Sequence, residues 1–490
     1  MSARGTNAVR AASVRGRSTD AGDDSPLRIV DIGHHSHDVL MDAEVAFWSL
    51  IARNRLDDVL ADGPLIAAWR AKRAAFAEEM DVLRFRLTPS AVYFNPTERC
   101  NLDCTYCYIP ADMRRRGQHM GETEMTAALD RLRDYFRTTV PEGRKPQIIF
   151  HGAEPLLNRE VMFAAIDRYH DDFRFGVQTN ATLLDDDAAA FLMERGVGIG
   201  LSLDGPVAEI ADRTRRSWGG EGTYAAVIAA MERLRGYDGY NVIATINQGN
   251  VAELTRLVEL FHAHEVPACM LNVVRCTQPA AETVRADDAL VTRHYLAALE
   301  RSHALYRATG RKLVVVNFAN ILISILAPTA RRLMCDISPC GGGRSFFALA
   351  PNGDLFPCSE FIGLPAFKGG NLFQDRIEDV LASPAFRTVT GRRVEDIAAC
   401  HDCTMRHFCG APCPAEAHEM NGGMDQTGAY CGFYAEQASY AFRLIADGRH
   451  DDFLWDGWDD GTEVAFSLDL ARLSRSTPGV GGEGSSWITG

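Results

Sequence analysis

Residues 99–108 read Arg99-Cys100-Asn101-Leu102-Asp103-Cys104-Thr105-Tyr106-Cys107-Tyr108. The three cysteines have a C-x3-C-x2-C spacing, and three thiolates at this spacing can hold three irons of a cubane iron–sulfur cluster. A fourth thiolate would complete the cluster as an electron carrier, whereas three leave one iron open to a small molecule. The alternative is a structural zinc site or a set of buried thiols, but zinc usually takes four ligands in two pairs, and no histidine stands nearby. The spacing therefore predicts a cluster that takes part in chemistry.

From about residue 89 the sequence alternates between β-rich and helical patterns. We expect strands over 91–95, 146–151, 173–178, 196–203, 241–247 and 268–275. We expect helices over 122–139, 186–195, 223–235 and 251–264. Six βα units of this length predict an α/β fold, a parallel barrel or a partial (β/α)6 TIM-like barrel. Chemistry in such barrels takes place at the C-terminal ends of the strands, and the cysteine loop follows the first predicted strand.

Glycine-containing and polar segments follow the next predicted strands. The second strand ends in His151-Gly152-Ala153-Glu154-Pro155, where glycine allows a ligand to approach the backbone closely. The third ends in Gln178-Thr179-Asn180, and the fourth ends in Ser202-Leu203-Asp204-Gly205-Pro206. Polar side chains at neighbouring strand ends can bind a small molecule. Ordinary turn formation is the alternative for each segment.

Eight further cysteines have a regular spacing in a second region. Cys340 is followed by twelve residues, Gly353, four residues and Cys358. The order continues as Cys400-x2-Cys403-x5-Cys409-x3-Cys413 and then Cys431, while Cys335 precedes the whole series. Eight thiolates suffice for two fully ligated cubanes. One zinc site made of Cys400, Cys403, Cys409 and Cys413 is the alternative, but it leaves the other four cysteines unused.

Composition narrows the class of protein. The chain has 490 residues, 46% hydrophobic and 24% charged, which is typical of a globular protein. Its net charge of −14 argues against nucleic acid as a partner. No apolar run reaches the roughly 18 residues that cross a membrane. Of the 13 cysteines, 11 fall in the two series, which favours metal ligation in a reducing cytoplasm over disulfides. Cys269 is expected to be a small buried hydrophobe, whereas Cys276 follows the sixth predicted strand and lies on the side of the expected site.

The segments on either side of the barrel are predicted from local pattern. Residues 27–88 are expected to be mostly helical, with one helix around Val39 to Ile51 and another over Leu65 to Leu83. The histidines His34, His35 and His37 are expected in a solvated turn. The predicted organisation is a disordered tail at 1–26, a helical and possible peptide-recognition segment at 27–88, the barrel at 89–284, bridging helices at 285–334, a cysteine-rich domain at 335–435 and a C-terminal helix with a flexible tail at 436–490.

The first cysteine series, with Tyr106 before its third cysteine, resembles the signature of radical SAM enzymes. In that family S-adenosylmethionine (SAM) chelates the open iron of a [4Fe–4S] cluster held by the residues that match Cys100, Cys104 and Cys107. The run at Gly152 resembles the family's GGEP motif, with Ala153 in place of the second glycine. The segments at Gln178 and Ser202 resemble those of its maturase branch. The resemblance implies SAM contacts from Tyr106, Gly152, Ala153, Glu154, Gln178, Asn180, Ser202, Asp204 and Arg215.

The second cysteine series is similar to the SPASM domain of sulfatase- and peptide-maturing radical SAM enzymes. By this resemblance Cys335, Cys340, Cys358 and Cys413 hold one auxiliary [4Fe–4S] cluster. Cys400, Cys403, Cys409 and Cys431 hold a second. Together with the first series, this makes three clusters. The resemblance covers roughly residues 89–435, which is most of the chain.

The resemblance implies an enzyme that reductively cleaves SAM to methionine and a 5′-deoxyadenosyl radical, which abstracts hydrogen from the substrate. The leading hypothesis is maturation of a ribosomally made peptide through an oxidative modification such as a thioether or carbon–carbon cross-link. The partners would be a peptide or protein substrate and an electron donor such as flavodoxin or ferredoxin. The first alternative is an anaerobic sulfatase maturase that forms formylglycine. The second is an iron–sulfur electron carrier without catalysis, which leaves the three-cysteine set unexplained.

Glu360 is the candidate proton acceptor. The sulfatase-maturing branch usually places an aspartate base directly after the cysteine that matches Cys358, but here Ser359 follows and Glu360 comes one position later. In an extended segment one position reverses the direction of a side chain. The sequence therefore leaves two options, a proton-accepting Glu360 and a structural Glu360 that faces away from the substrate.

Overall fold

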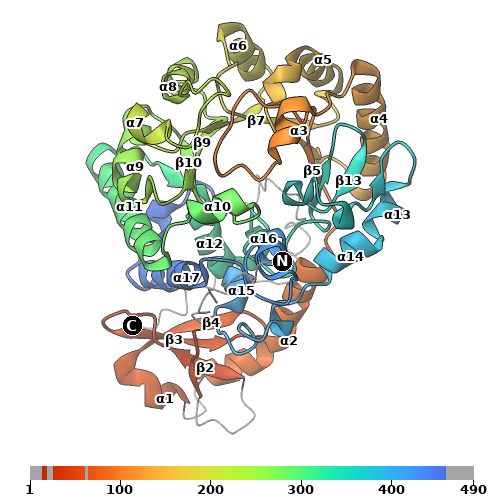
Figure 1. Cartoon of the computed structure of the whole chain (residues 1–490). Helices are drawn as coiled ribbons and strands as arrows, with labels where there is room; N and C mark the ends of the chain where they lie inside the picture. Colours follow the sequence, from red (N-terminus) through yellow and green to blue (C-terminus); the bar gives the residue numbers. More distant parts are fainter. Residues whose placement is uncertain (1–13, 19–25, 61–63, 459–490) are drawn as a thin grey trace, which may run out of the picture.

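The computed structural model of the chain describes residues 14–18, 26–60 and 64–458 (Figure 1). Most of the predicted N-terminal tail and the predicted flexible C-terminal tail lie outside these residues. Within them, no helix is long and apolar enough to span a membrane.

A ten-stranded sheet forms the centre of the molecule, in the order β11-β10-β9-β8-β7-β6-β5-β12-β13-β14. Six parallel strands run in sequence order through its middle: β5 (Ala91–Phe94), β6 (Gln147–Phe150), β7 (Arg174–Thr179), β8 (Gly198–Ser202), β9 (Tyr240–Ile246) and β10 (Ala268–Val273). Each falls within two residues of a predicted strand. The sheet ends at β11 and β14 without closing, so the predicted α/β fold with a partial barrel is confirmed.

Additional strands extend the sheet on both sides. β11 (Val314–Val315) pairs in parallel with β10, and β12 (Phe346–Leu349) pairs in parallel with β5. β13 (Asp354–Phe356) and β14 (Gly370–Asn371) continue from β12 as antiparallel strands. Because β12 to β14 come from the cysteine-rich region, that region joins the barrel edge next to β5, the strand that carries the first cysteine loop.

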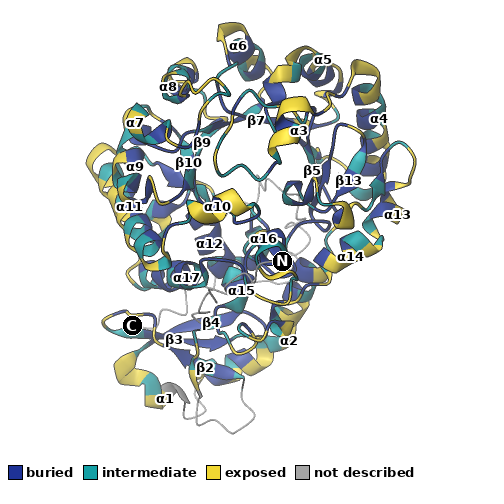
Figure 2. Ribbon diagram, in the orientation of Figure 1, coloured by how far each residue is buried: buried dark blue, intermediate teal, exposed yellow. Residues whose placement is uncertain are grey.

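Helices cover the outer face of the barrel (Figure 1). They are α4 (Glu122–Thr139), α5 (Arg159–Tyr169), α6 (Asp186–Glu194), α8 (Tyr224–Arg233) and α9 (Leu254–Ala263), with the short α3 (Ala111–Arg116), α7 (Ala208–Ala211) and α10 (Pro279–Thr283) in the connections. α4 has the predicted bounds. Each longer helix turns an apolar stripe inward, as α5 does with Met162, Ala165, Ile166 and Tyr169. Figure 2 shows the strands as mostly buried or intermediate and exposed residues on the outer sides of these helices.

The prediction that residues 27–88 are mostly helical is wrong for its first half. An antiparallel sheet is found there, made of β1 (Arg17–Ser18), β2 (Leu27–Val30), β3 (His37–Asp42) and β4 (Phe47–Ala52). We call this sheet, together with the two helices that follow it, the N-terminal unit. Val39 and Met41 face the main core, while Leu40 faces a smaller core under α2. Apolar residues therefore occupy both faces of β3, and such a run cannot be distinguished from a buried helix by periodicity.

The rest of the N-terminal unit contains the second predicted helix. α1 (Leu56–Leu60) is short, and α2 (Pro64–Phe85) contains the predicted segment from Leu65 to Leu83. Residues 14–18 were predicted to be disordered, but β1 pairs with β2, and the carbonyl of Val14 accepts a hydrogen bond of 2.9 Å from the Thr404 amide. His35 is exposed, as expected for a solvated turn. His34, however, is buried and bonded to Asp447 at 3.1 Å, and His37 begins β3, so the prediction is wrong for these two histidines.

The chain after the barrel is mainly helical and irregular. α11 (Asp288–Thr309) and α12 (Val316–Leu326) occupy the place of the predicted bridging helices. The cysteine-rich region adds α13 (Ile377–Leu381), α14 (Pro384–Thr390), α15 (Arg406–Cys409), α16 (Pro414–Asn421) and α17 (Cys431–Ala446). The predicted domain boundaries remain predictions.

Candidate functional site

The first cysteine loop lies at the C-terminal end of β5 and is held by a distant segment, residues 212–218. The Thr105 amide donates to the Thr214 carbonyl at 3.1 Å, and the Asp103 amide donates to the Arg216 carbonyl at 2.7 Å. The indole N–H of Trp218 donates to the Cys100 carbonyl at 2.8 Å. These bonds fix the backbone on which the three cysteines stand.

Arg114 supports the loop from within, and sequence reasoning missed it. This buried side chain donates to the carbonyls of Leu102 and Ile109, both at 3.0 Å. Burial raises the pKa of Cys107 to about 11, and the nearby Arg114 guanidinium opposes that rise. Burial also raises the pKa of Cys100 to about 12. The thiols are thus protonated at neutral pH in the protein alone, and a bound metal must displace their protons.

The predicted motif on β6 contacts the cysteine loop through β7. Both oxygens of the buried Glu154 carboxylate accept hydrogen bonds, from Thr179 Oγ1 at 2.8 Å and from the Asn180 amide at 2.8 Å. Asn180 in turn donates through Nδ2 to Asn101 Oδ1 at 2.8 Å and points at Cys100 Sγ at 3.9 Å. Glu154 therefore fixes the end of β7 against the cysteine loop.

Gly152 allows the close approach of two strand ends. Its φ of +102° is one that L-residues rarely adopt, and a Cβ there would lie 2.4 Å from the Asn95 amide group at the end of β5. Among the described residues, Asn95 Oδ1 is buried without a hydrogen-bond partner. Gly152 and Asn95 thus present backbone and an unsatisfied acceptor at the strand ends.

We expect Gly152→Ala to destabilise the strand ends and to weaken SAM binding. The strained φ alone costs at least about 1–2 kcal/mol, and the contact with Asn95 adds to it. Gly143→Ala is the matched control, because Gly143 has φ +84° but a Cβ there would meet nothing within 4 Å. Thermal unfolding and SAM titration of both variants separate the effect of the positive φ, which both variants have, from the effect of the contact with Asn95, which only Gly152→Ala has. Equal losses in the two variants would contradict this account of Gly152.

Tyr106, Asp204 and Arg215 form a buried cluster beside the cysteine loop. Arg215 Nη1 donates to the Tyr106 hydroxyl at 2.6 Å, and that hydroxyl donates to Asp204 Oδ2. The amide of Thr245 on β9 donates to Asp204 Oδ1 at 2.8 Å. Burial raises the pKa of Asp204, and the adjacent Arg215 opposes the rise. The three predicted residues are brought together, and they tie the loop to β8 and β9.

The other predicted residues at the strand ends have fewer hydrogen bonds to the rest of the protein. Gln178, Ala153 and Ser202 are half-buried, and Gln178 hydrogen-bonds His151. Burial lowers the pKa of His151 to about 4, so its imidazole is neutral at physiological pH. These positions lie at the C-terminal ends of β6, β7 and β8, where the sequence predicted a small-molecule site.

The eight later cysteines fall into two groups in space. The first group consists of Cys335, Cys340, Cys358 and Cys413. Burial raises the pKa of Cys358, and the nearby Glu360, Cys335 and Cys413 raise it further. Cys340 is in turn a close neighbour of Cys335. The second group lines one pocket between α15 and α17: Cys400, Cys403, Cys409 and Cys431. The assignment of these two groups to two clusters stays a prediction.

The zinc alternative receives no support from this arrangement. The pocket brings Cys431 to Cys400, Cys403 and Cys409, whereas the zinc alternative required Cys413. Across residues 14–18, 26–60 and 64–458, no three His, Cys, Asp or Glu side chains lie close enough to share a single metal ion.

Glu360 lies between the first cysteine loop and the first of these groups. It is in a 3-10 turn, Ser359–Phe361, and not in the extended segment that the sequence argument assumed, so the reversal of side-chain direction does not apply. Burial raises the pKa of Glu360 to about 7. Its Oε2 atom is buried with no hydrogen-bond partner among the described residues, and its charge reaches both Tyr108 and Cys358. The side chain therefore points inward.

Other ionisable side chains near Glu360 were missed by sequence reasoning. Arg275 follows β10 and donates to the Tyr434 hydroxyl at 3.3 Å. Glu416 on α16 accepts from the Cys276 amide at 2.9 Å. Arg275 and Glu416 both influence the pKa of Glu360, in opposite directions. The position of Arg275 after the sixth strand was the available signal. Cys269 is buried, as predicted, and Cys276 is also buried.

Comparisons with known proteins support the same two regions. The family described as the Radical SAM superfamily matches residues 94–261, and SPASM, described as an iron-sulfur cluster-binding domain, matches residues 340–404. An uncharacterized protein of Archaeoglobus fulgidus is 38% identical over 405 residues, covering 83% of this chain and 91% of that protein. A cysteine-type anaerobic sulfatase-maturating enzyme of Clostridium perfringens is 23% identical over 381 residues, covering 73% and 98%.

Two solved structures share the fold. The enzyme anSMEcpe with bound AdoMet has a TM-score of 0.64 at 18% identity, covering 76% of this chain and 97% of that chain. Streptococcus suis SuiB bound to precursor peptide SuiA has a TM-score of 0.53 at 13% identity, covering 77% and 86%. At these identities the likeness concerns the fold alone.

Proposed function

The chain belongs to the radical SAM superfamily and carries a C-terminal SPASM domain, and from this premise we propose that it is a peptide maturase that installs an oxidative cross-link. One observation carries the proposal. The three-cysteine loop at the end of β5 is joined by hydrogen bonds to the ends of β7 and β8, so one site collects the predicted residues of four strands.

At this site Cys100, Cys104 and Cys107 would hold three irons, and the backbone at Gly152 and Ala153 would receive the amino group of SAM. A cluster and SAM bound here supply a 5′-deoxyadenosyl radical that can take hydrogen from an unactivated carbon. Gln178, Asn180 and Ser202 would bind the ribose and carboxylate of SAM. Glu154 and the cluster of Tyr106, Asp204 and Arg215 hold the strand ends in place through their internal bonds, and any contact with SAM is additional to these.

The two cysteine groups of the SPASM domain would hold two auxiliary clusters. The first group, Cys335, Cys340, Cys358 and Cys413, is the nearer to Glu360 and to Tyr108 of the first cysteine loop. Because Cys335 is exposed, a substrate could reach this group. The protein's contribution is to place the substrate between the two centres and to exclude water.

A peptide is the substrate class that the comparisons favour. The solved anSMEcpe and SuiB structures with bound peptides share this fold. Cross-linking two side chains of a peptide removes two hydrogen atoms. One would leave as a hydrogen atom to the 5′-deoxyadenosyl radical, and the other as a proton and an electron. An auxiliary cluster would accept the electron, and the second carbon centre or thiol would release the proton. Glu360 would accept that proton, because it is turned inward beside the first auxiliary group and has a free buried oxygen.

A sulfatase maturase is the second candidate. It is favoured by the similarity to the Clostridium perfringens enzyme along 98% of that enzyme's length. The two candidates give different products. A cross-linked peptide loses two hydrogen atoms, whereas conversion of cysteine to formylglycine replaces the thiol with a carbonyl oxygen. Mass spectrometry of peptides encoded beside the gene, and of a sulfatase-derived peptide, treated with the full chain, SAM and a reductant, distinguishes them.

We expect Glu360→Gln to lose modified peptide while it still cleaves SAM. The substitution keeps the shape of the side chain but removes its ability to accept a proton, which is worth about 10²–10⁴-fold in rate for a general base. Glu378→Gln, at an exposed position on α13, is the control. An unchanged product yield with Glu360→Gln would assign this residue a structural role and place the proton acceptor elsewhere.

A further inference from the structure

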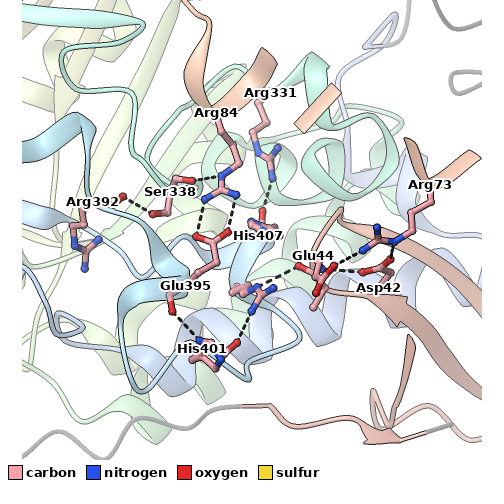
Figure 3. Close-up of polar contacts among 12 residues, drawn as sticks. Asp42, Glu44, Arg73, Arg84, Arg331, Ser338, Arg392, Glu395, His401 and His407 are labelled. Carbon is pink, nitrogen blue, oxygen red and sulfur yellow. Dashed lines mark hydrogen bonds and ion pairs between the residues drawn. The ribbon is translucent and has the colours of Figure 1, made fainter. Parts of the chain in front are cut away.

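The end of α2 is tied to both cysteine groups of the SPASM domain by one arginine. Arg84 is in the last turn of α2, and its side chain is 8% exposed. Its Nη1 and Nη2 atoms donate to the two carboxylate oxygens of Glu395 at 2.7 and 2.8 Å, and Nε donates to the Ser338 carbonyl at 2.6 Å. Figure 3 shows the guanidinium between these two partners.

Ser338 lies between two cysteines of the first group, Cys335 and Cys340. Its hydroxyl donates to the Arg392 carbonyl at 2.9 Å, which connects this loop to the segment that contains Glu395. Arg344 strengthens the same junction, because it donates to the Leu83 carbonyl on α2 at 3.0 Å and to the Cys340 carbonyl at 3.0 Å. The loop of the first group is therefore bonded directly to α2.

Glu395 belongs to the segment that leads into the second group. Its carbonyl accepts from His401 Nδ1 at 3.0 Å, immediately after Cys400. The N-terminal unit contacts this loop at two more points. Thr404 donates to the Val14 carbonyl, and Arg406 Nε donates to the Ala43 carbonyl at 3.2 Å. The loop between Cys403 and Cys409 is thus bonded to the N-terminal part of the chain at two points.

We propose that Arg84 is a positioning residue that holds the ligand loops of the two auxiliary clusters in register. This inference rests on the proposed function, because it takes the two cysteine groups to be cluster sites. A bidentate arginine–carboxylate pair defines both distance and orientation. Arg84 adds a third bond to a loop on the other cluster, so the two loops cannot shift independently. The N-terminal unit is then a structural part of the SPASM domain.

The chain offers a matched control in the same helix. Arg73 also pairs with acidic residues, donating to Asp42 Oδ2 at 2.9 Å and to Glu44, but these partners lie within the N-terminal unit (Figure 3). Arg73→Met therefore removes a more exposed arginine–carboxylate pair from the same helix, one in which the arginine makes no bond to a cysteine loop among the described residues. Arg84→Met leaves the Glu395 carboxylate without its arginine partner. An unpaired, partly buried charge of this kind destabilises a protein by itself. The double variant Arg84→Met, Glu395→Leu removes that second effect.

The test compares iron release from the reconstituted full-length variants to a chelator, together with thermal unfolding. We expect Arg84→Met to release auxiliary iron about 10-fold or more faster than the wild type, since loss of a residue that orients metal ligands typically costs 10–100-fold in affinity. The double variant should recover thermal stability but keep the fast release, and Arg73→Met should behave as the wild type.

Two results would overturn the role of Arg84. One is release from Arg84→Met at the wild-type rate. The other is recovery of slow release in the double variant together with its stability, which would make Arg84 a packing residue. A wild-type chain that binds only about four irons would overturn the proposed auxiliary clusters themselves, and this inference with them.

Discussion

A chain with Cys100→Ala, Cys104→Ala and Cys107→Ala is expected to form no 5′-deoxyadenosine from SAM under a strong reductant. These three cysteines stand on a loop fixed by Thr214, Arg216 and the Trp218 indole. In the proposed assignment they are the set that leaves one iron without a protein ligand, whereas each SPASM group would supply four thiols. Removing the set removes the place where SAM can bind metal, so the rate should fall to background.

The same variant should keep the iron of the SPASM domain, because Arg84, Arg344 and Arg392 hold those cysteine loops through contacts that do not involve the first loop. Cys269→Ala is the control, since Cys269 is a buried cysteine outside the three sets. Persistent 5′-deoxyadenosine in the triple variant would contradict the assignment of roles.

Removal of residues 1–88 is expected to leave a chain that does not fold to a soluble monomer. Seven large apolar side chains of the N-terminal unit are buried in the main core: Val30, Ile32, Val39, Met41, Leu50, Met80 and Leu83. Full burial of such side chains contributes about 1.5–3 kcal/mol each, or roughly 10–20 kcal/mol together. A domain's whole stability is only about 5–15 kcal/mol.

The polar contacts lead to the same expectation, because deletion also leaves Glu395 without Arg84. The measurement is solubility and size-exclusion chromatography of residues 89–490, with full-length Arg73→Met as the control for a damaged but present N-terminal unit. A soluble monomer of 89–490 that cleaves SAM would show instead that the N-terminal unit is a separable module, as a dedicated peptide-recognition segment would be.

The local sequence pattern correctly predicted those helices and strands whose side chains all lie in one kind of environment. The barrel strands and α4 were predicted within two residues, since their apolar residues and turn signals lie close together in sequence. The N-terminal sheet was mistaken for helix because β3 is buried on both faces, one against the main core and the other against α2. That second layer cannot be inferred from the strand's own residues.

The same limit applies to the site. Cysteine spacing indicated the two cysteine series because ligand spacing is a local property of the sequence. The division of the second series into two groups came from the resemblance to the SPASM domain. Arg84 and Ser338 are 254 positions apart, and Arg275 and Tyr434 are 159 apart, so their contacts leave no local signal. The direction of Glu360 depended on a 3-10 turn that the sequence argument took as extended.

Iron and acid-labile sulfide analysis of the anaerobically reconstituted full-length chain, with zinc measured in the same sample, tests the central claim most directly. The account predicts about twelve irons and as many sulfides per chain, in three cubane clusters held by Cys100, Cys104 and Cys107 and by the two SPASM groups. A value near four irons, with zinc bound in place of the auxiliary clusters, would contradict it.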